Sequence, residues 1–234
     1  MTNVLYKRIL EFNESLELDN GTLPNGIRAM NPFKEGDPEI ILKISAAFFK
    51  KFYNDNNPRR MILGINPGRH GAGVTGITFT DTKRLRDVCG IDYGVPETHE
   101  PSSVFFYEMI EAYGGAEKFY SDYFVNAVSP LGFVKMNDKG TEVNYNFYDD
   151  KTLENAVKPF IIETLKKQLE FNIIRDRCVC LGSGKNYKFL NALNKEHKFF
   201  DEVIPLEHPR FIMQYRNKRK SEYIEKYLNV LKRD

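Results

Sequence analysis

The chain has 234 residues, enough for one large domain with a substantial hydrophobic core. Hydrophobic residues make up 41% and charged residues 28%, so the composition excludes both a disordered chain and a chain embedded in a membrane. The formal net charge of +2 is too small for a protein that holds nucleic acid by its overall charge. Any nucleic-acid partner must therefore be bound by a local basic surface.

The cysteines and the N-terminal sequence bear on the compartment. Cys89, Cys178 and Cys180 are too few for a disulfide framework and lack a fourth partner for an all-cysteine metal or iron–sulfur site, so we expect reduced, buried thiols. The first ten residues lack the layout of a signal peptide, and no later run of about 18 apolar residues could span a bilayer. We expect a cytoplasmic protein that does not contact membranes.

The pattern of apolar residues predicts an α/β fold. Helices are expected first, over residues 4–18 and 37–54. Short, nearly continuous apolar runs then alternate with helix-like stretches, as in strands that are covered on both faces. The runs cover 60–66, 122–129, 177–183 and 201–208, and the helix-like stretches cover 101–115, 152–171, 184–197 and 220–233. This alternation predicts a parallel sheet with helices on both faces.

The remaining segments complete a prediction of one domain over residues 1–234. Residues 1 to about 55 are interpreted as a helical N-terminal extension. Residues 132–150 form an excursion between strand and helix, in which Asn-Asp-Lys-Gly at 137–140 is typical of a hairpin turn. We assign no chemistry to this excursion.

A glycine-rich segment, GINPGRHGAG at 64–73, directly follows the first apolar run. In open α/β sheets ligands bind where strands end, and glycine loops can hold phosphates there. The segment lacks the G-x-G-x-x-G register of dinucleotide-binding loops. The later sequence VCLGSGKN has Val179 and Asn186 where a P-loop needs Gly and Ser or Thr. Neither nucleotide motif is met.

Three separate segments resemble a known family. LGINPGRHGAGVTGITF resembles the first motif of the uracil-DNA glycosylase superfamily, in its single-strand-selective monofunctional (SMUG-like) branch. FVNAVSPL resembles the strand end that carries the base-reading asparagine, and LEHP resembles the second catalytic motif. The order and separation of these motifs fit from about residue 60 to the C-terminus. The matching residues are Asn66, Pro67, Gly68, Gly71, Thr75, Gly76, Phe79, Asn126 and His208.

The resemblance implies a three-layer α/β/α sandwich around a four-stranded parallel sheet. It also implies a monofunctional glycosylase that hydrolyses the N-glycosidic bond of uracil in DNA and leaves an abasic site for base-excision repair. No cofactor and no metal are implied, and a monomer suits this chemistry. Because Gly68 leaves room near C5 of the base, 5-hydroxymethyluracil is expected as a further substrate by family analogy, and other deaminated bases are candidates.

The resemblance assigns a role to each matching side chain. Asn66 would hold the attacking water, and His208 would donate to uracil O2 as negative charge builds there. Asn126 would pair with uracil and leave cytosine with unpaired polar groups, while Phe79 would stack on the base. Taken singly, each residue has an ordinary structural alternative: an Asx-turn for Asn66, a surface cap for His208, a turn for Asn126 and core packing for Phe79.

The sequence departs from the branch in two places. Relatives continue the second motif as His-Pro-Ser-Pro-Arg, whereas here it continues as HPRFIMQYRNKRK, and Thr78 replaces the usual proline. The candidates for the wedge that replaces the flipped base are Arg210, Phe211, Ile212 and Met213, and those for phosphate contacts are Arg216, Lys218 and Arg219.

Two further residues near the glycine-rich segment are candidates for the site. His70 lies within the segment itself. Asp81 could accept a proton or bind a base edge, although Asp before a helical sequence is more often an N-cap.

Two other functions stay open. One is a nucleic-acid-binding module of the same fold without efficient catalysis. The other is an enzyme that handles nucleosides or nucleotides, which would explain the glycine-rich segment but not the basic and apolar residues at 210–220.

Overall fold

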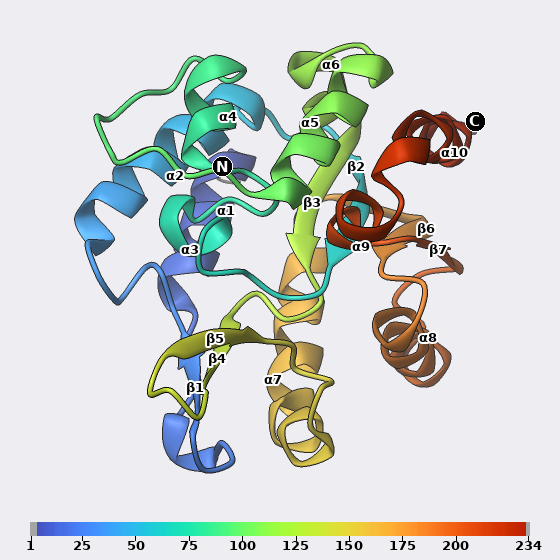
Figure 1. Cartoon of the computed structure of the whole chain (residues 1–234). Coiled ribbons are helices and arrows are strands. Elements are labelled where there is room, and N and C mark those ends of the chain that lie inside the picture. Colours follow the sequence, from blue (N-terminus) through green and yellow to red (C-terminus); the bar gives the residue numbers. More distant parts are fainter. Residues whose placement is uncertain (1–3, 233–234) are drawn as a thin grey trace.

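A four-stranded parallel sheet lies at the centre of the computed structural model, which describes residues 4–232 (Figure 1). The strand order is β3-β2-β6-β7, so β2 is an inner strand and all four carboxyl ends meet at one edge. The predicted α/β fold with a parallel sheet is therefore confirmed. The strands are β2 (Arg59–Gly64), β3 (Tyr123–Ala127), β6 (Ile173–Leu181) and β7 (Glu202–Leu206).

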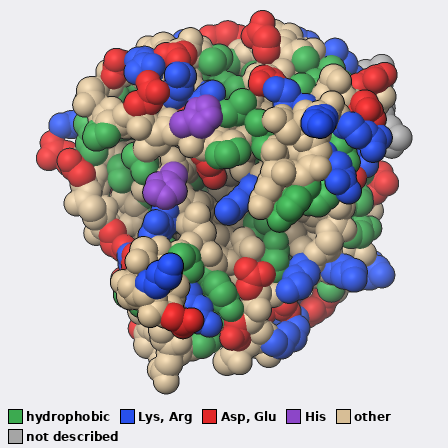
Figure 2. Space-filling model, in the orientation of Figure 1, with side chains coloured by type: hydrophobic (Ala, Val, Ile, Leu, Met, Phe, Trp, Pro, Cys, Tyr) green, Lys and Arg blue, Asp and Glu red, His purple; other side chains and the backbone are tan. Residues whose placement is uncertain are grey.

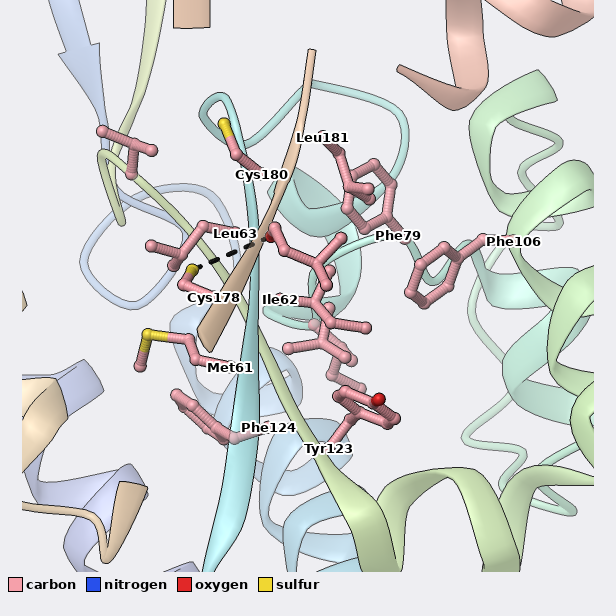
Figure 3. Close-up of a cluster of buried hydrophobic side chains, with 14 of the residues drawn as sticks. Met61, Ile62, Leu63, Phe79, Phe106, Tyr123, Phe124, Cys178, Cys180 and Leu181 are labelled. Atoms are coloured by element: carbon pink, nitrogen blue, oxygen red, sulfur yellow. Dashed lines mark hydrogen bonds between the residues drawn. The ribbon is translucent and has the colours of Figure 1, made fainter. Parts of the chain in front are cut away.

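Helices cover both faces of this sheet, because successive side chains of a strand point to opposite faces. The ring of Tyr123 stacks on Phe119 of α6, while Phe124 meets Phe171, which packs against Phe12 of α1. Figure 3 shows the same alternation on β2, with Ile62 on the side opposite Met61 and Leu63. The helices that cover the sheet include α1 (Leu5–Ser15), α5 (Pro101–Tyr113), α6 (Ala116–Asp122), α7 (Lys151–Leu169), α8 (Lys185–His197) and α10 (Lys220–Leu231).

A second sheet stands apart from the first, below it in Figure 1. It is antiparallel, with the order β1-β4-β5. Strands β4 (Gly132–Met136) and β5 (Glu142–Tyr145) form the hairpin predicted from the sequence. Strand β1 (Ile27–Met30) pairs with β4 and was not predicted, so the N-terminal segment is not purely helical.

The N-terminal segment packs into the same hydrophobic cluster as the sheet. Leu5 of α1 and Phe48 of α2 (Pro38–Phe52) are buried in it, beside residues of β2 and β6. Arg59, which is fully buried at the start of β2, donates to both oxygens of Asp55 at 2.8 and 2.9 Å and to Tyr120 O at 2.7 Å. A buried cation needs such partners, so Arg59 ties the end of the N-terminal segment to the sheet and to α6.

The remaining predictions on local structure have mixed outcomes. All three cysteines are buried and unpaired, as expected. The last predicted helix ends at Leu231, while Arg233 lies outside the described residues. The helical sequence expected after Asp81 is α4 (Thr82–Asp87). Three short helices were not predicted: α3 (Ala72–Thr75), α6 and α9 (Pro209–Tyr215). Within residues 4–232, no helix is both long and apolar enough to cross a membrane.

Candidate active site at the carboxyl edge of the sheet

A cavity of about 330 Å³ opens at the carboxyl edge of the parallel sheet. Figure 2 shows this side of the molecule hollowed near its middle. Loops that follow β2, β3 and β7 meet there, together with the starts of α5 and α9 and the exit of the β4–β5 hairpin. Its walls include Gly64, Asn66, Pro67, Gly68, Thr78, Phe79, Glu100, Ala127, Asn144, Asn146, Tyr148, His208, Arg210, Phe211, Gln214 and Tyr215.

The amide of Asn66 is held at both ends by main-chain groups of the hairpin exit. Its Nδ2 donates to Tyr145 O at 3.2 Å, and its Oδ1 accepts from the backbone N–H of Phe147 at 3.2 Å. Turning the amide over would set donor against donor, so these bonds fix its orientation. One lone pair of Oδ1 remains for another partner. The exit of the hairpin, to which the sequence assigned no chemistry, thus supports the orientation of Asn66.

Phe79 forms an aromatic wall of the cavity. Its backbone φ is 58°, a left-handed conformation that is costly for a residue with a side chain and is held only where the surroundings enforce it. The ring stacks on Phe106 with centroids 4.7 Å apart and lies against Gly64, where an added Cβ would stand 2.8 Å from the ring. Figure 3 shows Phe79 and Phe106 side by side. Gly64 thus carries no side chain because the Phe79 ring occupies that space.

His208 follows β7 and caps the first turn of α9. Its Nδ1 accepts from the backbone N–H of Arg210 at 3.1 Å. Burial, with a smaller contribution from the nearby Arg210 cation, lowers the pKa of His208 to about 4. The imidazole is therefore neutral at pH 7, and because Nδ1 accepts, its proton lies on Nε2. His208 is thus a neutral hydrogen-bond donor, and its ring lies 5.5 Å from that of Phe79.

Asn126 lies in β3, where its backbone pairs with Leu63 of β2, and its side chain is half-buried. Its Oδ1 accepts from the backbone N–H of Ala127 at 2.9 Å and from the Thr78 hydroxyl at 3.5 Å. The second contact is long and therefore weak. Ala127 and Thr78, its two hydrogen-bond partners, both line the cavity, whereas Asn126 itself is not among the lining residues.

The glycines of the first motif have different neighbours. Gly68 lines the cavity, and an added Cβ there would stand 3.4 Å from Glu100 Oε1. At Gly71 an added Cβ would overlap the same carboxyl group, 2.0 Å from Oε2. Gly76 has a left-handed φ of 70° and faces the ring of Phe33 instead, so it does not border the cavity.

Glu100 is a site residue that the sequence analysis missed. It precedes α5, more than twenty positions from the nearest motif, and no local pattern marks it. Its backbone N–H bonds to Asp81, but within residues 4–232 its carboxyl group has no hydrogen-bond donor. Burial and the neighbouring Asp81 carboxylate raise its pKa to about 7, against the opposing effect of the Arg210 cation.

Comparison with known proteins identifies the family. The family model of the uracil DNA glycosylase superfamily matches residues 50–232. The chain belongs to the uracil-DNA glycosylase superfamily. It is similar along nearly its whole length to the crystal structure of wild-type SMUG2 from Pedobacter heparinus, with 52% identity over 99% of this chain and 98% of that chain and a TM-score of 0.95. The comparison with curated proteins found no match.

Membership in the uracil-DNA glycosylase superfamily makes this chain a DNA glycosylase, a hydrolase of N-glycosyl bonds. The expected three-layer fold and the resemblance drawn from the motifs are confirmed. Within residues 4–232, no cluster of His, Cys, Asp or Glu side chains is arranged to hold a metal ion.

Asp81 and His70, two further candidates for the glycosylase site, do not line the cavity. Asp81 is fully buried and caps α4, where its carboxylate accepts from the backbone N–H of Arg84 at 2.8 Å and pairs with the Arg84 guanidinium at 3.1 Å. The N-cap alternative therefore describes its contacts. Its carboxylate acts on the site through Glu100, whose pKa it raises. His70 is exposed at the tip of the glycine-rich segment and does not line the cavity.

The glycosylase's candidate DNA-facing surface is α9, which borders the cavity. Phe211 is 39% exposed, whereas Ile212 is fully buried in the core and Met213 is half-buried against it. Ile212 is therefore not available to enter DNA, because its side chain packs in the hydrophobic core. The sequence alone does not distinguish these neighbours, because their burial depends on how α9 packs against the core.

The basic residues that follow differ in their partners. Arg216 and Lys218 are exposed, and the Arg216 guanidinium lies 5.5 Å from the centroid of the Phe211 ring. Arg219 and Lys220 form ion pairs with Glu222 and Glu108. In Figure 2 Lys and Arg side chains stand beside hydrophobic atoms over α9.

Proposed function

We propose that this glycosylase removes uracil from DNA and leaves the sugar–phosphate strand intact. One observation carries the proposal: Asn66 and Phe79 of the first motif and His208 of the second, far apart in the sequence, line one cavity at the carboxyl edge of the sheet. A base stacked within duplex DNA cannot reach such a cavity, so the nucleotide must be flipped out of the helix. A cavity of about 330 Å³ has room for a single pyrimidine ring.

Asn126 and Phe79 would select and hold the base. Uracil offers O4 as an acceptor and N3–H as a donor, and an amide with Nδ2 and Oδ1 side by side complements both. N3–H would displace the weak 3.5 Å contact from the Thr78 hydroxyl to Asn126 Oδ1. Cytosine reverses both groups, so it would leave buried polar groups unpaired. Phe79 would stack on the ring, a contact worth about 1 to 3 kcal/mol.

His208 would stabilise the leaving group. When the bond between C1′ and N1 breaks, the electron pair stays on the base and negative charge develops on O2. The neutral His208 imidazole presents its Nε2–H as the donor for this charge, because its Nδ1 is already bonded to the backbone of Arg210. No proton transfer is needed for this stabilisation.

Asn66 would position the water that attacks C1′. Its amide orientation is fixed by Tyr145 and Phe147, which leaves one Oδ1 lone pair for the water. An amide is not basic enough to remove a proton at neutral pH, so bond breaking must run ahead of attack. The water then adds to an oxocarbenium-like sugar and loses its proton to solvent.

The test is a comparison of oligonucleotides that carry a single uracil, thymine or cytosine, incubated with the protein and then treated with alkali to cut abasic sites. We expect cleavage of the uracil strand only, and loss of that cleavage in Asn66→Ala. Tight binding without abasic sites would support a binding module instead. Hydrolysis of free deoxyuridine with none in DNA would support a nucleoside enzyme.

A further inference from the structure

Glu100 is the only carboxylic acid among the described residues that line the cavity, and neither the motifs nor the proposed chemistry uses it. Its carboxyl group lies over the glycine-rich segment, 3.4 Å from where a Cβ of Gly68 would be. Asn144 Nδ2 lies 3.6 Å from the same point, so a small space above Gly68 is bounded by polar atoms.

The edge of the base that faces this space follows from the proposed function, on which this inference rests. With O2 toward His208 and the edge of N3 and O4 toward Asn126, the remaining edge of a pyrimidine is C5–C6. The remaining wall is the segment at Gly68, with Glu100 behind it. A substituent on C5 would therefore point at the Glu100 carboxyl group.

Gly68 has no side chain that would block a 5-methyl group, so the protein needs another means of distinguishing thymine from uracil. Thymine differs from uracil only by this methyl group, and shape alone does not exclude it here. A methyl group pressed on Glu100 would remove water from a polar group that has no hydrogen-bond donor within residues 4–232. Leaving such a group unsatisfied is costly, whereas the hydroxyl of a 5-hydroxymethyl group would satisfy it.

We propose that Glu100 is a specificity-determining residue that reads the 5-position of the base, accepting 5-hydroxymethyluracil through a hydrogen bond and rejecting thymine. Its surroundings keep the group available for this role. Asp81 and Arg210 are the charged neighbours that act on it, from the cap of α4 and from α9, with opposite effects. Near neutral pH, with its pKa raised to about 7, the carboxyl group exists in both forms, and each form can accept a hydroxyl hydrogen bond.

The test compares kcat/KM for 5-hydroxymethyluracil, thymine opposite guanine, and uracil in the full-length protein. In Glu100→Leu, which keeps the bulk but removes the polar group, we expect the ratio of 5-hydroxymethyluracil to uracil excision to fall about 10- to 100-fold. Thymine excision relative to uracil should rise. Glu100→Gln keeps an acceptor at the same length and should retain most of the wild-type ratio.

Glu97→Gln is the matched control, because it removes one carboxylate from the same loop, outside the cavity, and should leave both ratios at the wild-type value. Ratios measured on one preparation do not depend on the folded fraction. Unchanged ratios in Glu100→Leu, or wild-type protein that excises uracil but not 5-hydroxymethyluracil, would overturn the inference and leave the proposed function standing. Failure of the wild type to excise uracil would instead overturn the proposed function.

Discussion

Asn66 and His208, on the strand-edge wall of the cavity, are both held by main-chain hydrogen bonds. On the wall formed by α9, Phe211 and Tyr215 expose 39% and 59% of their surface, and their rings contact each other with centroids 5.5 Å apart. This difference indicates that the side chains of Asn66 and His208 are held in position before DNA binds. The second wall keeps side-chain freedom, as suits a surface that must fit a deformed DNA strand.

The sharpest test of the fixed wall is Asn66→Ala. Removing the positioned acceptor should lower kcat for uracil excision about 1,000-fold, because the attacking water loses the amide oxygen that orients it. Binding of a uracil oligonucleotide should change little. Single-turnover kinetics and a binding titration measure both quantities. Asn54→Ala, at an exposed asparagine after α2, is the control and should match the wild type. Equal losses in binding and in rate would contradict a role in positioning water.

His208→Ala should produce the next largest effect, a fall in kcat of about 100- to 1,000-fold from loss of the donor to O2. The neutral state is tested separately by NMR, with the His208 signals assigned by their absence from this variant. Because its pKa is lowered to about 4, the ring should stay neutral as the pH falls from 8 to 5 and take up a proton only near pH 4. A titration midpoint near 6.5 would contradict the neutral donor.

Glu100 gives a third test, which concerns stability. Its folded-state pKa of about 7 lies above its ordinary value of 4.5, so the folded state holds this proton more tightly than the unfolded chain. The resulting stability is complete below pH 4.5 and is lost as the pH rises through 7. Glu100→Gln stays neutral and should therefore exceed the wild type in unfolding free energy by about 1 to 3 kcal/mol at pH 8.5, with little difference at pH 4.5.

Urea unfolding at the two pH values measures this difference. Glu97→Gln is the control, because Arg86 and Lys83 lower the pKa of Glu97 and its replacement should bring no gain at high pH. An equal gain in stability at both pH values in Glu100→Gln would contradict the raised pKa, because it would show that ionisation of Glu100 does not destabilise the folded state.

The smallest expected effect lies on the exposed wall. Phe211→Ala should weaken binding of uracil-containing duplex about 10-fold, because an apolar side chain no longer fills the space left by the base. Binding of single-stranded DNA should fall less, since no base stack has to be opened. Arg216→Ala serves as the comparison, and it should weaken the binding of duplex and of single-stranded DNA to a similar degree. It should also reduce the salt dependence of binding by the equivalent of about one phosphate contact. Equal effects of Phe211→Ala on both substrates would exclude a wedge.

Strands were predictable from the sequence where they are buried on both faces, because such strands are continuous runs of apolar residues. Strands β2, β3 and β7 were predicted to within a few residues, because both faces of each are covered. The first half of β6 was missed because Asp176 lies on it and pairs with Arg60 at 2.8 Å, so that half reads as polar. Strand β1 was missed because four residues, IRAM, carry too little pattern to indicate a strand.

The site was predictable where a side chain belongs to a motif, as at Asn66, Phe79 and His208, which the structure brings to one cavity. It was not predictable where the partner is a main-chain atom, such as Tyr145 O, because any residue supplies a carbonyl. Glu100 was missed for a related reason. Its contact with the glycine-rich segment arises from tertiary packing across more than twenty intervening positions.

The pairing of β1 with the hairpin has a consequence for where this protein can be cut. The family model begins at residue 50, and a fragment starting there would keep every motif. It would lose β1, the outer strand beside β4, and with it Met30, whose Cε lies 2.6 Å from the Cβ position of Gly132. The hairpin would then be a two-stranded ribbon, which is rarely stable in water. The side-chain amide of Asn66, which the hairpin exit orients, would be free to rotate. The part of the chain that the family model covers, residues 50–232, is therefore an incomplete enzyme without the strand that precedes it.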